Sequence, residues 1–136
     1  MTKPKREEQP ISEQVIREWL KQSKHKKSPW GETLDSNEYA KPLFDTQYGV
    51  CFICGAEGDT ARHEVFYGTA DRQTSKAVGC WVYVCPKCHE KIHNNANLDK
   101  ALKMSMQILF ERIHTRRWGK ECARDEFMAL FGRNYL

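Results

Sequence analysis

The sequence predicts an α+β fold: a small domain closed by a zinc ion, with helices on its N-terminal and C-terminal sides. Two C-x2-C pairs, Cys51/Cys54 and Cys85/Cys88, offer the four thiolates of a structural zinc site. Apolar residues recur at helical spacing on both sides of these pairs. With 136 residues, of which 40% are hydrophobic, the chain can build one modest core, and a metal would add the stability that small cores lack.

Composition narrows the classes of function. A formal net charge of +4 favours a polyanionic partner only weakly. The N-terminal residues are charged and no run approaches the roughly 20 apolar residues that cross a bilayer, so we expect neither a secretion signal nor a membrane partner. In the cytoplasm, where we therefore place the protein, paired cysteines are more often metal ligands than disulfides. The sequence leaves the oligomeric state open.

The N-terminal part is predicted to contain a tail, a helix and a linker. Residues 1–10 are expected to form a flexible tail, and residues 11–43 a helix followed by a basic linker. The helix, over residues 11–22, follows from apolar residues at Ile11, Val15, Ile16, Trp19 and Leu20. Residues 23–42 are expected to be an exposed loop. The basic run within it, residues 24–29, is interpreted either as a solubilising face or as an arm that contacts phosphates.

Residues 44–97 are predicted to form the zinc-bound domain. Gly55 follows the first cysteine pair, where glycine lets the backbone turn tightly. The second pair stands at the start of a short helix, because Pro86 suits a first turn and Asn94 a natural end. The 30 residues between the pairs have room for a hairpin, whose second strand is predicted at residues 80–84. Turn, hairpin and helix in this order make the treble-clef arrangement.

Three histidines of this domain favour a second metal site. His89 and His93 are four residues apart on the predicted helix, so both imidazoles face one side and can bind one divalent ion. Two protein ligands leave room for water and a substrate phosphate, as catalysis requires. His63 lies in the predicted hairpin and would act as a further ligand or as a base, since a neutral imidazole accepts a proton near neutral pH.

Residues 98–136 are predicted to be a helical extension that packs on the zinc domain. A helix from Leu98 to His114 carries apolar residues on one face. A shorter helix, from Arg124 to Phe131, ends at Gly132, where glycine commonly terminates a helix.

These motifs together resemble the HNH endonuclease superfamily, whose ββα-metal site is often built on a zinc-bound treble clef. The similarity covers residues 49–95: the first cysteine pair, His63, and the segment Cys85-x2-Cys88-His89-x3-His93. The segment His63-Glu64-Val65-Phe66-Tyr67-Gly68 and the ending 126–136 look like small phage and prophage proteins of this kind. The resemblance implies a phage-encoded or prophage-encoded, metal-dependent DNA endonuclease in the cytoplasm of a bacterial host.

The resemblance also implies the site residues and the products, which are 5′-phosphate and 3′-hydroxyl ends. His89 and His93, with Glu64 as a further candidate, would bind the catalytic Mg²⁺, Mn²⁺, Ni²⁺ or Zn²⁺. We take His63 as the base that activates water; in the alternative His63 is a ligand and Glu64 is the base. Neighbouring DNA phosphates would be contacted by Arg62, Arg72, Lys76 and Lys87.

The first strand departs from the superfamily, which often has a metal ligand and a base side by side there. This chain offers Arg62-His63 or His63-Glu64, and Arg62 cannot bind metal if His63 is the base. A second departure lies before the last strand. These enzymes usually carry an Asn before the last strand, where it steadies the loop that holds the base. This chain has Gly79-Cys80 at that position. The two departures keep an interpretation from another class open: a non-catalytic treble-clef zinc module that binds nucleic acid or protein.

Overall fold

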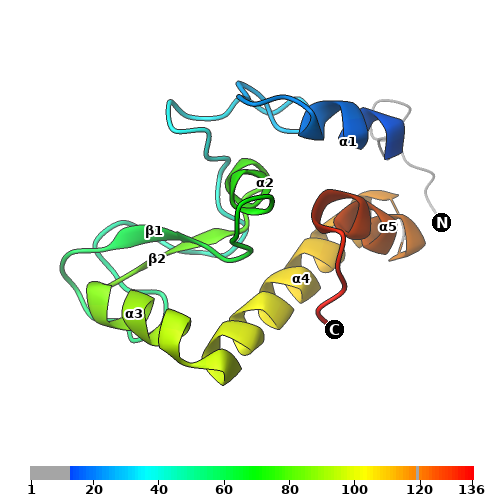
Figure 1. Ribbon diagram of the computed structural model, residues 1–136. Coiled ribbons are helices and arrows are strands. Elements are labelled where there is room, and N and C mark those ends of the chain that lie inside the picture. Colours follow the sequence, from blue (N-terminus) through cyan, green and yellow to red (C-terminus); the bar gives the residue numbers. More distant parts are fainter. Residues whose placement is uncertain (1–12, 119) are drawn as a thin grey trace.

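The computed structural model describes residues 13–118 and 120–136, so the predicted tail and the first two residues of the predicted N-terminal helix lie outside the described part (Figure 1). The described residues form helices on both sides of one small antiparallel sheet, which confirms the mixed helix and strand content. The elements in chain order are α1 (Glu13–Leu20), β1 (Ala61–Glu64), α2 (Arg72–Ala77), β2 (Trp81–Val84), α3 (Pro86–Asn94), α4 (Ala96–Trp118) and α5 (Lys120–Phe131).

The sheet is a pair of short strands in the middle of the chain. β1 runs antiparallel to β2, with His63 opposite Val82. His63 is buried, whereas its neighbours Arg62 and Glu64 are half-buried, as expected from the alternation of side chains along a strand. The predicted strand at residues 80–84 is confirmed to within one residue.

The strands are not joined by a simple hairpin turn, because α2 lies between them. This helix has only six residues, and its sequence, RQTSKA, carries no apolar repeat that would have predicted it. Gly79 follows α2 with φ of +83°, and a Cβ at this position would collide with the carbonyl oxygen of Lys41. Only glycine therefore fits the turn into β2 without displacing backbone.

The helix that carries the second cysteine pair begins and ends where the sequence predicts. Cys85 is its N-cap, and the Cys85 sulfur accepts a hydrogen bond from the Cys88 N–H. Pro86 occupies the first turn, where its missing N–H costs nothing. Asn95 separates α3 from α4, and its side-chain oxygen caps α4 by accepting from the N–H groups of Asn97 and Leu98. This cap explains why α4 begins before Leu98.

The main core joins the sheet region to the C-terminal helices. α4 packs against α5, and α1 also contacts α5 (Figure 1). Phe66, just after β1, is fully buried, and its ring lies 4.5 Å from that of Phe131 and 5.3 Å from that of Phe127, measured between centroids. These aromatic contacts attach the residues after His63 to α5.

The segment 23–42 is irregular, as predicted, but it is not a surface linker. His25, Leu34 and Ala40 are buried, each less than 9% exposed. The Ala40 N–H donates to the Lys76 carbonyl, and the indole of Trp81 donates to the Ala40 carbonyl. These hydrogen bonds attach the segment to α2 and β2, and they give the buried indole N–H of Trp81 its acceptor. Of the helices that the structure describes, none is long and apolar enough to cross a membrane.

Candidate metal centre

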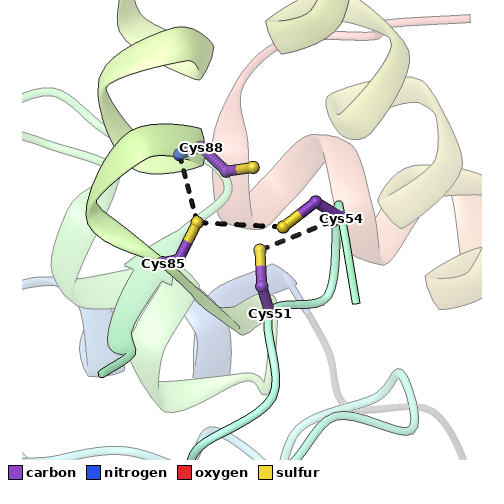
Figure 2. Close-up of side chains that lie close together, drawn as sticks. All are labelled: Cys51, Cys54, Cys85 and Cys88. Carbon is purple, nitrogen blue, oxygen red and sulfur yellow. Dashed lines mark hydrogen bonds between the residues drawn. The ribbon is translucent and has the colours of Figure 1, made fainter. Parts of the chain in front are cut away.

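Four cysteines from two separate segments meet at one point. The sulfurs of Cys51, Cys54, Cys85 and Cys88 all lie within 4.8 Å of one another and turn toward one shared space (Figure 2). The Cys54 and Cys85 sulfurs are 3.9 Å apart. Tetrahedral zinc with bonds of about 2.3 Å would place its sulfurs about 3.8 Å from one another. The predicted ligand set is therefore assembled with a spacing that fits a metal such as zinc.

The protonation chemistry of these thiols also fits a bound dication. Burial opposes ionisation of Cys51, but hydrogen bonds from backbone N–H groups, among them that of Cys54, lower its pKa to about 6. At Cys88, burial and the neighbouring sulfurs raise the pKa. Without a cation, one ionised thiol thus disfavours ionisation of the next. A dication removes this conflict, because thiolate is the form that binds zinc.

Three histidines form a second cluster, separate from the cysteines. One ring nitrogen from each of His63, His89 and His93 lies within 4.8 Å of the others. The ring centroids of His63 and His89 are 5.2 Å apart, and those of His63 and His93 are 5.6 Å apart. Three nitrogens bound at about 2.1 Å to a tetrahedral ion are about 3.4 Å apart. The side chains therefore need only a small closing movement to hold one ion.

α3 serves both clusters because successive residues on a helix point about 100° apart. Cys88 and Ile92 are buried, 5% and 1% exposed, and face the core. His89 and His93, one position further on, are half-buried and exposed. The same helix thus directs one side chain of each pair toward the interior and the next toward an open pocket.

The histidines line a pocket of about 280 Å³. Beside them it contains Arg62, Glu64 and Arg72, all predicted as site residues from the sequence. Two of the predicted DNA-binding residues do not line the pocket. Lys87 is exposed at the start of α3, and Lys76 lies at the edge of the pocket, with its ammonium 4.8 Å from the centre of the Tyr39 ring. The pocket thus combines three imidazoles, a carboxylate and two guanidinium groups.

Burial favours the neutral form of His63 and His89, which is the form that binds metal. His63 is 2% exposed, and burial, together with the charges of His89 and His93, lowers its pKa to about 4. The pKa of His89 is lowered as well, by burial and then by His93. His63 Nε2 is buried with no hydrogen-bond partner among the described residues. A buried, unpaired nitrogen is costly unless a ligand satisfies it.

Two tyrosines that the sequence did not identify complete the pocket. Tyr67 follows β1 and its ring centroid lies 5.0 Å from that of His93. Tyr39 comes from the segment interpreted as a linker. Burial raises the pKa of Tyr39, and so do the charge of Glu64 and a hydrogen bond to it, so the hydroxyl stays protonated and donates to the carboxylate. Arg72 also faces Glu64, at 3.7 Å.

The chain was compared with protein-family models, with curated proteins and with solved structures. No family model, curated protein or solved structure matches it. What its own residues establish is a four-cysteine cluster suited to a metal such as zinc, beside a pocket of three converging histidines.

Proposed function

We propose that this chain is a metal-dependent DNA endonuclease of the HNH type. The observation that carries the proposal is the meeting of His63, His89 and His93 in an open pocket that also contains a carboxylate and two arginines. A structural site would be closed, whereas a catalytic site keeps room for water and substrate. Phosphodiester hydrolysis needs these parts: a divalent ion, a base and cations that bind phosphate.

The order of the elements supports the same proposal. A cysteine turn, an antiparallel strand pair and a helix that begins with the second cysteine pair follow one another, as in a treble clef. β1, β2 and α3, which supply and flank the histidines, follow the order of a ββα-metal motif. In this arrangement the four cysteines hold a structural zinc ion that fixes α3 against the sheet, and α3 in turn fixes two of the three imidazoles.

The geometry favours His63 as a metal ligand rather than as the base. Its Nε2 is buried and lacks a partner among the described residues, and one of its ring nitrogens lies within 4.8 Å of nitrogens of His89 and His93. A base must reach solvent or substrate, and Glu64 in the pocket is better placed to do so, with its side chain 15% exposed. We therefore assign the metal to the three histidines and the base to Glu64.

When bound, a divalent ion supplies Lewis-acid stabilisation of the phosphate and the leaving oxygen. The protein's own side chains supply the base, the groups that orient it and a cation for phosphate. Glu64 accepts a proton from the attacking water, and the Tyr39 hydroxyl and Arg72 hold the carboxylate in place. Arg72, 62% exposed, is available to bind a phosphate as well. Arg62 is engaged by Asp35 at 2.7 Å and has a more structural role.

Ser75 can steady the loop before β2, which is the role that the resemblance implies for an Asn. The Ser75 hydroxyl is fully buried, accepts a hydrogen bond from the Phe66 N–H and donates one to the Cys80 carbonyl. It thereby connects the segment just after β1 to the residue before β2. A loop held in this way needs no Asn at Gly79-Cys80 to keep its shape.

The test is cleavage of supercoiled plasmid with Mg²⁺, Mn²⁺, Ni²⁺ or Zn²⁺. Wild-type protein should nick the plasmid, and His63→Ala and His89→Ala should abolish nicking while they retain one zinc per chain. Arg112→Ala, an exposed change on α4 away from both clusters, serves as the control and should cut normally. If the zinc-loaded wild type cuts neither plasmid nor branched DNA with any of these ions, the catalytic proposal fails.

A second candidate is the non-catalytic zinc module. The observation that favours it is that the four cysteines by themselves make a complete ligand set for a structural metal ion, without any histidine. It predicts one zinc ion per chain, no cleavage, and DNA or protein binding that is indifferent to replacement of His93. The plasmid experiment separates the two candidates directly.

A further inference from the structure

The loop after α1 presents three lysines with free ammonium groups. Lys24, Lys26 and Lys27 are exposed, and none of them forms an ion pair with any residue that the structure describes. They line one side of an open hollow of about 1040 Å³, together with Trp19 and Ser36. Three free cations in one hollow would repel one another unless an anion lies between them.

The backbone that carries these lysines is held rigidly. The indole of Trp19 donates to the Lys27 carbonyl at 2.9 Å, and the ring of His25 stacks on Trp19 with centroids 3.6 Å apart. The Leu34 N–H donates to the Lys26 carbonyl at 2.9 Å. A flexible solubilising run has no need of such anchors, whereas a binding surface loses less entropy when it is ordered in advance.

The acidic residues of the same hollow are already engaged. Asp35 accepts hydrogen bonds from Arg62 and from the N–H groups of Asn37 and Tyr39. Glu38 accepts from the His25 N–H and from the side chain of Gln73. Asp35 is paired with Arg62, and the three lysines outnumber Glu38, so the hollow carries a net positive charge.

This hollow adjoins the histidine pocket. Asp35 lines the hollow and Arg62 lines the pocket, and the ion pair between them, 2.7 Å long, forms the wall that the two share. Glu38 and Tyr39, adjacent in the chain, line the hollow and the pocket respectively. Figure 1 shows the segment, coloured blue to cyan, passing from α1 beyond α2 toward the sheet.

We propose that Lys24, Lys26 and Lys27 bind the phosphate backbone of a nucleic-acid strand whose neighbouring phosphate enters the histidine pocket. The proposal rests on the proposed function in that the strand bound here is the strand that is cut. Lysines contact phosphates as mobile point charges and read no base, so this binding is independent of sequence. The loop thus belongs to the substrate site and sets affinity rather than the chemical step.

The experiment measures binding of zinc-loaded full-length protein to a labelled DNA duplex of about three helical turns without the catalytic ion, at several salt concentrations. The test variant replaces Lys24, Lys26 and Lys27 with Gln. The control replaces Lys100, Arg112 and Arg133 with Gln; these residues are also exposed, and their replacement removes the same charge from the α4 and C-terminal side. Circular dichroism and zinc content establish that both variants are folded.

The loop variant should bind at least about tenfold more weakly at about 0.1 M salt. Its plot of log affinity against log salt should be less steep by about 0.9 for each phosphate that a lysine no longer neutralises. The control should weaken binding much less. Equal weakening in both variants, wild-type binding by the loop variant, or no binding by the wild type would each overturn the proposal.

Cleavage separates this inference from the proposed function. If the wild type cleaves DNA, the loop variant should show a higher KM than the wild type and the same kcat. A wild type that binds through the loop but never cuts contradicts the nuclease and leaves the loop as a binding surface. A wild type that cuts with no dependence on the loop contradicts the loop proposal alone.

Discussion

Arg62 on β1 and Asp35 in the loop after α1 form an ion pair with 2.7 Å between the guanidinium Nη1 and the carboxylate Oδ2. The same guanidinium lies 4.2 Å from the centre of the Tyr39 ring. Asp35 also accepts from the Tyr39 N–H, so it holds both the arginine and the tyrosine. This pair fixes the N-terminal loop to the strand that carries His63 and Glu64.

Replacing Asp35 should separate its two roles. Asp35→Asn keeps an oxygen for the N–H groups of Asn37 and Tyr39 and loses only the partly exposed ion pair, so we expect a loss of less than about 1 kcal/mol in the free energy of unfolding. Asp35→Ala loses both and should cost about 1–2 kcal/mol. Urea unfolding measures the two values, with Asp45→Ala as an exposed control. Equal losses in Asp35→Asn and Asp35→Ala would show that the hydrogen bonds from the N–H groups of Asn37 and Tyr39 contribute nothing to the free energy of unfolding.

Removal of the metal from the cysteine cluster should unfold the sheet region. Zinc on such a set contributes on the order of 10 kcal/mol, as much as the whole stability of a small domain. We expect a chelator, or Cys85→Ser, to abolish cooperative thermal unfolding and to release one zinc ion per chain. Cys122→Ser lies outside the cluster and should retain the metal. Full zinc content in Cys85→Ser would contradict the assignment.

Glu64→Gln tests the proposed base. The change keeps the size of the side chain and one acceptor oxygen but removes its ability to take a proton, so kcat should fall about 10²-fold to 10⁴-fold with little change in KM. Glu90→Gln, the same change at an exposed position of α3 outside the pocket, should be without effect. Wild-type turnover by Glu64→Gln would return the role of base to His63.

The stability of the N-terminal loop should depend on pH through His25. Burial against Trp19 lowers the pKa of His25, and the charge of Glu38 offsets this only in part. The unfolded chain, with a histidine pKa of about 6.5, therefore binds more protons than the folded protein once the pH falls below that value. Stability contributed by neutral His25 is present above about pH 6.5 and is lost as the pH falls through its lower folded value.

His25→Phe keeps a ring on Trp19 and removes the titration. The difference in unfolding free energy between about pH 7.5 and about pH 5 should be smaller in this variant than in the wild type, measured by urea unfolding. An unchanged difference would place the acid sensitivity in other groups.

Gly79→Ala and Gly132→Ala form a matched pair for backbone strain. Both glycines have positive φ, +83° and +68°, but only at Gly79 would a Cβ meet backbone, at the Lys41 carbonyl oxygen. Gly132→Ala should cost about 1 kcal/mol, the penalty of left-handed backbone. Gly79→Ala should cost at least about 2 kcal/mol, since α2 must also move away from the loop. Equal values would mean that the close approach is easily relieved.

The features that the sequence predicts well are those that depend on neighbours in the chain. Pro86 and Cys85 fix the start of α3 within one turn, and Asn94 its end. The spacing of His89 and His93 places both on one side of that helix whatever surrounds it. The cysteine pairs can be assigned to one site because two C-x2-C pairs in a small chain are typical of a four-thiolate zinc site.

What the sequence cannot predict depends on packing between distant segments. Tyr39 joins the pocket through Asp35, 27 residues before Arg62, and nothing in the composition of residues 23–42 indicates it. α2 is stabilised by hydrogen bonds to that same loop rather than by an apolar face of its own. The local pattern around His63 gives no sign of its burial, because the rings of Tyr67 and His89 reach it from outside β1.

Cys88 and His89 are consecutive residues on one rigid helix, so the two metal clusters cannot respond independently. Any rotation of α3 about its axis would turn Cys88 and the imidazoles of His89 and His93 together, because all three belong to that helix. A metal held by the four cysteines would thereby also fix the shape of the histidine pocket, whatever that pocket binds.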